Sequence, residues 1–332
     1  MMKCLKPVGI VGTGSCLPER ILTNSDLEKI VDTSDEWITT RTGIKERRIS
    51  DDKTATSDLA TCAALRAMES AGVVAEDIDL IIVGTVTPDM AFPSTACIVQ
   101  DNIGAVNAAA FDLEAACTGF IYGLSVGEKF ISTGQAKTVL VIGAETLSKI
   151  CNWEDRNTCV LFGDGAGAAV LREVEEGSGI MSTVLGAEGW KGKALMQPAG
   201  GSRMPASHET IEGKKHYIHM DGSEVFKFAV NIMAQAARKV AEKVGIGMEQ
   251  INYIIPHQAN IRIVEAAAKR LNFDMERIYV NLDSYGNMSA ASIPVALDEA
   301  AKAGKIVKGD NVLLVGFGAG LTWGSCIVRW SI

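Results

Sequence analysis

The chain has 332 residues and a formal net charge of −8; 47% of its residues are hydrophobic, 22% are charged and 33 are glycine. This composition excludes a disordered chain, and the length allows two ordinary domains around a large packed core. The acidic balance argues against a nucleic-acid-binding protein, so an acidic partner would need a local basic patch.

The sequence shows no sign of a membrane or secreted protein. No apolar run approaches the ~18 residues that a membrane helix needs. The first residues lead into only a few apolar side chains before Gly12, which does not fit a signal peptide. The cysteines have irregular spacings without a Cys-x-x-Cys pair, at Cys4, Cys16, Cys62, Cys97, Cys117, Cys151, Cys159 and Cys326. We therefore expect free thiols and a cytoplasmic location.

Predicted helices and strands alternate along the chain. Residues 63–73 have the apolar spacing of an amphipathic helix, and residues 78–83 form a short apolar run typical of a buried strand. A second strand is predicted at 108–113, before a helical segment that starts near Cys117, and a third at 139–142. The alternation predicts an α/β fold with largely parallel sheets that are buried on both faces.

The same pattern returns 173 positions later. The helix and strand at 63–82 recur at 236–255, and the strand at 138–143 recurs at 311–316. Alanine-rich helices could produce one such match by chance, but two blocks at one offset indicate a duplication. The predicted halves are residues 1–173 and 174–332.

One long segment lacks this regularity. Residues 188–217 show little periodicity and are rich in glycine and proline, so we expect an insertion or cap near a site. His208 and His216 lie in this segment and His219 follows it. The His216-x-x-His219 spacing has no clear third ligand, so we expect surface histidines and no metal.

Three reactive side chains lie where predicted strands of the two halves end. In open parallel sheets, ligands bind at the carboxyl ends of the strands. Cys117 follows the strand at 108–113, and His257 follows the strand at 251–255. Asn287 lies three residues before the position that the offset relates to Cys117. The sequence therefore predicts a site where cysteine, histidine and asparagine converge from both halves.

Each of these residues also has a simpler interpretation. Cys117 could be a small buried apolar residue, although its place at the first turn of a helix favours a thiolate nucleophile. His257 could be structural, although it is the one histidine that follows a buried strand, and Asn287 could form a turn with Gly286. The apolar interpretation is the one we expect for Cys62, Cys97, Cys159 and Cys326.

Three glycine runs need an explanation. Residues 9–14 meet Pro18 rather than a helix, and residues 163–167 lack the Lys-Ser/Thr of a phosphate loop. We expect both to be tight turns for close packing. Residues 316–320 directly follow a predicted strand, where exposed backbone N–H groups could hold an oxyanion.

Four segments together resemble the β-ketoacyl-acyl-carrier-protein synthase III family, the condensing enzymes that start bacterial fatty-acid synthesis. They are residues 116–120, 256–260, 286–292 and 316–324, and the resemblance extends over essentially the whole chain in order. It implies the thiolase fold, a five-layered αβαβα sandwich of two pseudo-symmetric halves, as a homodimer. The internal repeat is what that fold requires.

The resemblance also implies a reaction. Cys117 would attack a short acyl-CoA, and the backbone N–H groups of Cys117 and Ala319 would hold the oxyanion. The family commonly has glycine at the second position, where alanine offers the same N–H in less space. Malonyl-acyl-carrier protein would then lose CO₂, with His257 and Asn287 stabilising the enolate, and 3-oxoacyl-carrier protein would form. No cofactor is implied, because the CoA thioester is a substrate.

Several further residues match substrate-binding positions of the family. Trp37, Arg41 and Arg156, together with Asn260, match residues that contact CoA through stacking and charge. Without the resemblance, Trp37 would more often be a packing residue. Phe92 matches a dimer-interface residue that closes the acyl pocket of the partner subunit.

A basic patch matches the surface that receives the acidic carrier protein. Arg262, Lys269 and Arg270 lie seven and eight positions apart, so they share one face of a predicted helix, and Lys227 resembles a fourth member. A charged helical face is often simply solvated, so the patch depends on the resemblance for its meaning.

Two other classes of enzyme stay open from the sequence. A papain-like thiol hydrolase uses Cys, His and Asn in this chain order, and the separation of Cys117 and His257 falls within its ~130–150 residue spacing. Its Cys-Gly-Ser/Ala-Cys-Trp/Tyr signature is absent, however, and it leaves the duplication unexplained. A polyketide or hydroxymethylglutaryl-CoA type of starter enzyme on the same fold would differ only in its product.

Overall fold

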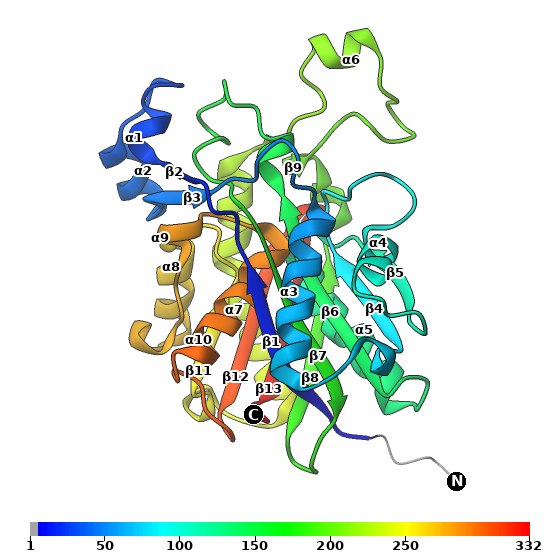
Figure 1. The fold of residues 1–332 in the computed structure, drawn as a ribbon. Coiled ribbons are helices and arrows are strands. Elements are labelled where there is room, and N and C mark those ends of the chain that lie inside the picture. The colour runs from blue at the N-terminus through cyan, green and yellow to red at the C-terminus, as the bar shows by residue number, and fades with distance from the viewer. Residues whose placement is uncertain (1–5) are drawn as a thin grey trace.

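Two mixed β-sheets lie face to face, with helices between them and on both outer sides (Figure 1). This arrangement comes from a computed structural model that describes residues 6–332. Cys4 and the first residues of the segment considered as a signal peptide lie outside the described residues. Within residues 6–332, no helix is both long and apolar enough to cross a membrane.

The first sheet has the strand order β1-β7-β6-β4-β5. Its strands are β1 (Val8–Cys16), β7 (Asp164–Glu173), β6 (Thr138–Thr146), β4 (Leu80–Gly84) and β5 (Ala109–Leu113). β4 pairs in parallel with β5 and β6, whereas β7 pairs antiparallel with β6 and β1.

The second sheet repeats this order without an equivalent of β5. It consists of β11 (Tyr253–Pro256), β12 (Asn311–Gly318), β13 (Thr322–Arg329) and β8 (Gly179–Ala187). β11 and β12 are parallel, and the other two pairs are antiparallel. The expectation of largely parallel sheets is therefore wrong in part. β13 follows β12 after the three-residue turn η8 (Ala319–Leu321), which is too short for the crossover that parallel pairing needs.

Helices separate and cover the sheets in three layers. α5 (Gly119–Ser132) and α10 (Ser292–Lys302) lie between the sheets, where an apolar cluster joins both of them. α3 (Thr56–Ala71) and α4 (Thr95–Asn102) cover the outer face of the first sheet. α7 (Gly222–Val244) and α8 (Ile261–Leu271) cover the outer face of the second. The predicted αβαβα sandwich is thus confirmed.

Equivalent elements of the two halves keep the offset of 173 residues. β4 and β11, β6 and β12, and α5 and α10 each begin 173 positions apart. α3 and α7 end at Gly72 and Gly245, which have the same separation and both adopt the left-handed conformation that favours glycine. The repeat seen in the sequence is therefore a repeat of secondary structure.

Smaller elements form a lobe and a projection above the sandwich. The lobe contains β2 (Ile21–Thr23), α1 (Asn24–Leu27), α2 (Asp35–Thr42), β3 (Glu46–Arg48) and α9 (Leu282–Tyr285). The projection contains β9 (Leu195–Met196), α6 (His208–Glu212) and β10 (His219–Met220), and Figure 1 shows α6 extending away from the body. Residues 188–217 thus form a mostly irregular extension, as predicted.

Two glycine runs that were expected as turns lie in extended strands. Gly12 and Gly14 are in β1, where an added Cβ would lie 2.5 Å from Ala71 N and 2.4 Å from Ala67 N of α3. The run at 163–167 likewise leads into β7. Turn formation is therefore the wrong reason for these glycines, while close packing is the right one.

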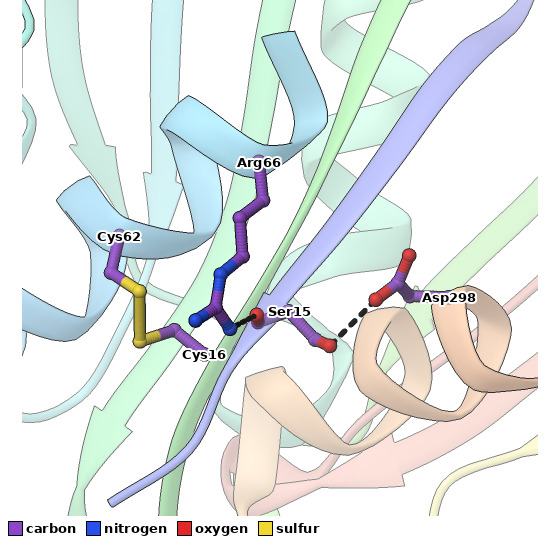
Figure 2. The surroundings of a disulfide bond; sticks show 5 residues. All are labelled: Ser15, Cys16, Cys62, Arg66 and Asp298. Carbon is purple, nitrogen blue, oxygen red and sulfur yellow. Dashed lines mark hydrogen bonds between the residues drawn. A yellow bond between two sulfur atoms is a disulfide. The ribbon is translucent and has the colours of Figure 1, made fainter. Parts of the chain in front are cut away.

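A disulfide joins α3 to the end of β1 (Figure 2). Cys16 and Cys62 are bonded, with Cα atoms 5.8 Å apart, because α3 packs along β1. Beside them, Arg66 donates to Ser15 O, and the Ser15 hydroxyl donates to Asp298. The expectation of eight free thiols is therefore wrong for this pair. Of the residues expected to be small and apolar, Cys159 and Cys326 are buried, whereas Cys97 is exposed and Cys62 is cross-linked.

A Gly143→Ala variant tests the packing at the centre of the sandwich. A Cβ at residue 143 would lie 2.1 Å from Ala290 O, so the backbone between the halves would have to shift. We expect the free energy of unfolding in urea to fall by about 1–3 kcal/mol. Gly201→Ala is the matched control, since a Cβ there has nothing within 4 Å. Equal losses in both variants would contradict the packing argument.

Candidate active site

Cys117 lies in a short turn between the two sheets. It belongs to η2 (Ala116–Thr118), which leads directly into α5, and it is only 7% exposed. Ala116 has φ +45°, in the left-handed region that disfavours a side chain, so the chain turns sharply before the cysteine. The predicted position at the start of a helix is therefore correct.

The protonation state of Cys117 differs from the expectation. Burial raises the pKa of its thiol to about 12, and the nearby Glu145 raises it further, while Ser289 lowers it. The predicted resting thiolate is therefore wrong for this structure, because desolvation outweighs the favourable start of the helix. The thiol must lose a proton before it can act as a nucleophile.

His257 directly follows β11, as predicted. Its N–H donates to Val315 O at 2.8 Å, and its ring meets the Phe317 ring edge-on at a centroid distance of 5.5 Å. Burial lowers the pKa of the imidazole to about 3, so the ring is neutral at physiological pH. A neutral imidazole can donate a hydrogen bond without adding charge to the site.

Asn287 is held by its backbone and by its side-chain oxygen. Its N–H donates to Leu161 O at 2.8 Å, and its carbonyl accepts from Gly163 N at 3.0 Å. Its Oδ1 accepts from Ser289 N at 2.8 Å, which leaves Nδ2 as the donating end of the side chain. Asn287 therefore does more than form a turn with Gly286.

The structure brings these three side chains together. Cys117, His257 and Asn287 line one cavity of about 150 Å³, with Phe317 and Gly318 also in its wall. An added Cβ at Gly318 would lie 2.7 Å from Cys117 N, so this position depends on glycine. The predicted convergence is thus correct as geometry, while the role of each residue stays a prediction.

A second, wider cavity adjoins the same cysteine. It measures about 650 Å³, and its wall includes Cys117, Ser289 and Ala319, as well as Gly192 and Gln197 from the irregular extension. Ala319 follows β12 and shares this cavity with Cys117, as an oxyanion position requires. The extension therefore lies beside the site, as predicted.

The residues predicted to contact CoA form a cluster in the lobe. The guanidinium carbons of Arg41 and Arg156 lie 5.0 Å and 5.2 Å from the Trp37 ring. Asn260 donates to Arg41 O at 3.0 Å, caps α8 and also lines the narrow cavity. The cluster and the nucleophile are thus linked through one asparagine.

The remaining predicted positions lie on the surface. Phe92 is 84% exposed, in the loop between β4 and α4, and the wide cavity reaches the neighbouring Met90 and Ala91. The histidines of the extension have local partners: His216 Nε2 lies 2.9 Å from Thr210 Oγ1, and His219 Nε2 lies 3.3 Å from Lys214 O. Residues 6–332 contain no group of three or more potential metal ligands.

The basic patch is exposed on two packed helices. Arg262 lies 5.4 Å from the Phe226 ring, and Arg270 donates to Asn231 Oδ1 on α7. The patch comprises Lys227 on α7 and Arg262, Lys269 and Arg270 on α8, all of them exposed. The predicted common face of α8 is therefore solvent-accessible.

Comparison with known proteins identifies the family. The sequence profile of the 3-oxoacyl-[acyl-carrier-protein (ACP)] synthase III family matches residues 111–189, and the profile of its C-terminal part matches residues 241–330. A β-ketoacyl-[acyl-carrier-protein] synthase III from Caldanaerobacter subterraneus subsp. tengcongensis is 65% identical over 97% of this chain and 98% of its own length. This chain belongs to the β-ketoacyl-[acyl-carrier-protein] synthase III family. It is therefore a condensing acyltransferase, and the papain-like alternative is wrong.

Solved structures of synthase III relatives have the same fold. The 3-oxoacyl-[acyl-carrier-protein] synthase III from Aquifex aeolicus VF5 is 51% identical, covers 97% of this chain with all of its own, and has a TM-score of 0.90. The priming β-ketosynthase of the R1128 polyketide pathway is 32% identical, with a TM-score of 0.92 over 100% of this chain and 98% of its own. The sequence is thus more similar to these synthase III relatives than to the polyketide enzyme.

Proposed function

We propose that this synthase III catalyses the decarboxylating condensation of a short acyl-CoA with malonyl-acyl-carrier protein. The products are 3-oxoacyl-acyl-carrier protein, CO₂ and CoA, and the reaction initiates fatty-acid biosynthesis. The observation that carries the proposal is the cavity shared by Cys117, His257 and Asn287, in a chain of this family.

In the first half-reaction, Cys117 Sγ attacks the thioester carbonyl of acyl-CoA. A tetrahedral oxyanion forms, and the N–H groups of Cys117 and Ala319 stabilise it. The bond to the CoA sulfur then breaks, leaving an acyl-enzyme. The wide cavity beside Cys117 offers space for the acyl chain.

In the second half-reaction, malonyl-acyl-carrier protein loses CO₂ to form an enolate. Its oxygen receives hydrogen bonds from neutral His257 and from Nδ2 of Asn287, which stabilise the charge as it develops. The enolate carbon attacks the acyl group, and the Cys117 sulfur leaves. No cofactor is needed, because both bonds that break lie in the substrates.

The binding surfaces belong to the same proposal. Trp37, Arg41 and Arg156, with Asn260, would hold CoA, and the patch of Lys227, Arg262, Lys269 and Arg270 would hold the carrier protein. Phe92 would enter the interface of a homodimer, where a second copy covers the open side of the wide cavity. We further propose a cytoplasmic location and a division of the chain into halves at 1–173 and 174–332.

A Trp37→Ala variant tests the CoA surface. Loss of the ring between Arg41 and Arg156 should raise KM for acyl-CoA about 10-fold while kcat changes little, because binding is weakened away from the reacting atoms. Steady-state kinetics with varied acyl-CoA measure this split. The matched control is Trp190→Ala, since Trp190 is 77% exposed and is not part of the cluster. An unchanged KM in the Trp37 variant would contradict the assignment.

Mass spectrometry of the intact protein tests the proposed function most directly. The protein is incubated with a series of acyl-CoA thioesters of different chain length and branching, and the adduct is located by peptide mapping. We expect one acyl group on Cys117 and CO₂ release after malonyl-acyl-carrier protein is added. No adduct with any member of the series would overturn the proposal.

A further inference from the structure

A buried carboxyl group lies close to the nucleophile and has no part in the mechanism above. Glu145, near the end of β6, is completely buried. Its Oε2 accepts from Thr87 Oγ1 at 2.6 Å, Val86 N at 3.1 Å and Thr85 Oγ1 at 3.2 Å. Within residues 6–332, its Oε1 accepts only from Val86 N, at 3.3 Å. One oxygen is thus firmly held, and the other retains lone pairs for a further donor.

Ser289 connects this carboxyl group to the nucleophile. Its hydroxyl is buried and has no hydrogen-bond partner of normal geometry among residues 6–332. The same hydroxyl lowers the pKa of both the Cys117 thiol and the Glu145 carboxyl group, as expected for a donor that can turn toward either. Ser289 and Cys117 also line the wide cavity together. A buried hydroxyl without a fixed partner is rare, which points to a role in the reaction.

The duplication gives Ser289 the counterpart position of the nucleophile turn. Ser289 lies 173 residues after Ala116, and the two have nearly the same left-handed backbone, with φ +46° and +45°. Glu145 lies 173 residues before Gly318, whose backbone contacts Cys117. A strand residue therefore supports each turn, and only the first half has a carboxyl group at that position.

We propose that Ser289 and Glu145 take up the proton of the Cys117 thiol during acylation and return it when the acyl group leaves. The inference depends on the proposed function, because it concerns the same acylation step. Ser289 touches the reacting sulfur, whereas Glu145 acts through Ser289 and is a positioning residue and proton store.

The proton transfer balances as follows. The Sγ–H bond of Cys117 breaks, its proton moves to Ser289 Oγ, and the hydroxyl proton of Ser289 moves to Glu145 Oε1. The sulfur electron pair forms the new bond to the acyl carbon, and CoA leaves as a thiolate that takes a proton from solvent. When condensation expels the Cys117 sulfur, the proton returns from Glu145 along the same route.

The bases near Cys117 differ in strength in the direction that the proposal needs. Burial raises the pKa of Glu145 to about 7, whereas it lowers the pKa of His257 to about 3. Among residues 6–332, the thiol is the titratable group that interacts with Glu145; its other neighbours are Thr85, Val86 and Thr87.

Carboxylates on adjacent segments are engaged elsewhere. Asp89 accepts from the backbone N–H and hydroxyl of Ser57, and Asp164 accepts from Ser50 and Ser148. Glu145 is therefore the carboxyl group that is available to the thiol.

The pH profile of acylation tests the proposal. With rapid mixing of enzyme and acyl-CoA between pH 6 and 9, the wild-type rate should rise up to about pH 7, as Glu145 ionises, and then level off. Glu145→Gln should acylate about 100-fold more slowly at pH 7.5 and show no plateau, because the rate then follows the small thiolate fraction. Ser289→Ala should show the same profile, and the double variant should be no slower than either single one.

Two features of the chain keep this test interpretable. Ala116 already adopts the backbone conformation of Ser289, so alanine is tolerated there. Because the pKa of Glu145 is higher in the folded protein than its ordinary 4.5, ionisation weakens the fold as pH rises through about 7. Glu145→Gln should therefore melt at a higher temperature than the wild type at pH 8. Should that variant be unstable, Ser289→Ala decides alone.

The matched control is Asp298→Asn, which removes another fully buried carboxylate, bonded to Thr13 and Ser15. It should keep the wild-type pH profile of acylation. Wild-type plateaus in both site variants, or equal losses at every pH, would overturn the inference. If the wild-type protein itself forms no adduct on Cys117, the proposed function fails instead, so the two failures are distinguishable.

Discussion

A Cys117→Ala variant should form no acyl adduct with any acyl-CoA, and its condensation rate should fall by about 1,000-fold or more. Both half-reactions pass through the bond between the acyl carbon and Sγ, so no other group can replace this sulfur. Intact-protein mass spectrometry and CO₂ release from malonyl-acyl-carrier protein measure the two steps separately.

Cys326→Ala is the control for the loss of a buried thiol. Burial raises the pKa of Cys326 to about 12, as it does for Cys117, but Cys326 lies on β13, and its sulfur accepts from Thr183. The control should keep its adduct and its activity. Full acylation of the Cys117 variant would show that another residue is the nucleophile.

Alanine at His257 or Asn287 should separate the two half-reactions. Each variant should still be acylated by acyl-CoA, because neither side chain is required for the attack of Cys117 on the thioester. Release of CO₂ should fall by about 100–1,000-fold in each, since one hydrogen bond to the developing enolate is lost. Single-turnover acylation and CO₂ assays on the same samples provide the comparison.

The pH response of these variants gives a further check. Because the pKa of His257 is lowered to about 3, the ring stays neutral, and CO₂ release should show no histidine titration between pH 6 and 8. His208→Ala is the control, since this side chain lies on α6, away from the cavity that Cys117 lines with His257. A loss of acylation equal to the loss of CO₂ release would contradict the division of labour.

The repeat and the main site could be predicted because both depend on local patterns. The offset of 173 residues is visible without any knowledge of packing, and it relates α5 to α10 and β6 to β12. The rule that ligands bind at strand ends was sufficient to select Cys117, His257 and Asn287. These predictions needed only which residues follow which strands.

Strand direction and cross-links could not be obtained in the same way. The residues of β7 and β13 are as apolar as those of parallel strands, and their direction is set by short connections whose path the composition does not define. The bond between Cys16 and Cys62 forms because α3 lies along β1, which no 46-residue spacing implies.

The electrostatics of the site were the least predictable part. The start of a helix favours a thiolate, but complete burial has the larger effect on Cys117, and burial depends on every neighbouring element. Glu145 and Ser289 were missed for the same reason. A carboxylate at the end of the apolar strand β6, and a serine opposite Ala116 in the repeat, were the available signals.

The packing of the two nucleophile turns explains why the duplicated chain has a single catalytic centre. Ala290, the counterpart of Cys117, is fully buried, and its Cβ and carbonyl oxygen press against Gly119 and Gly143. There is no room for a thioester at that position. The second half has thus exchanged chemistry for scaffolding: its turn fills the space behind the first, and fusion of two ancestral copies yielded one reactive sulfur that is positioned by both.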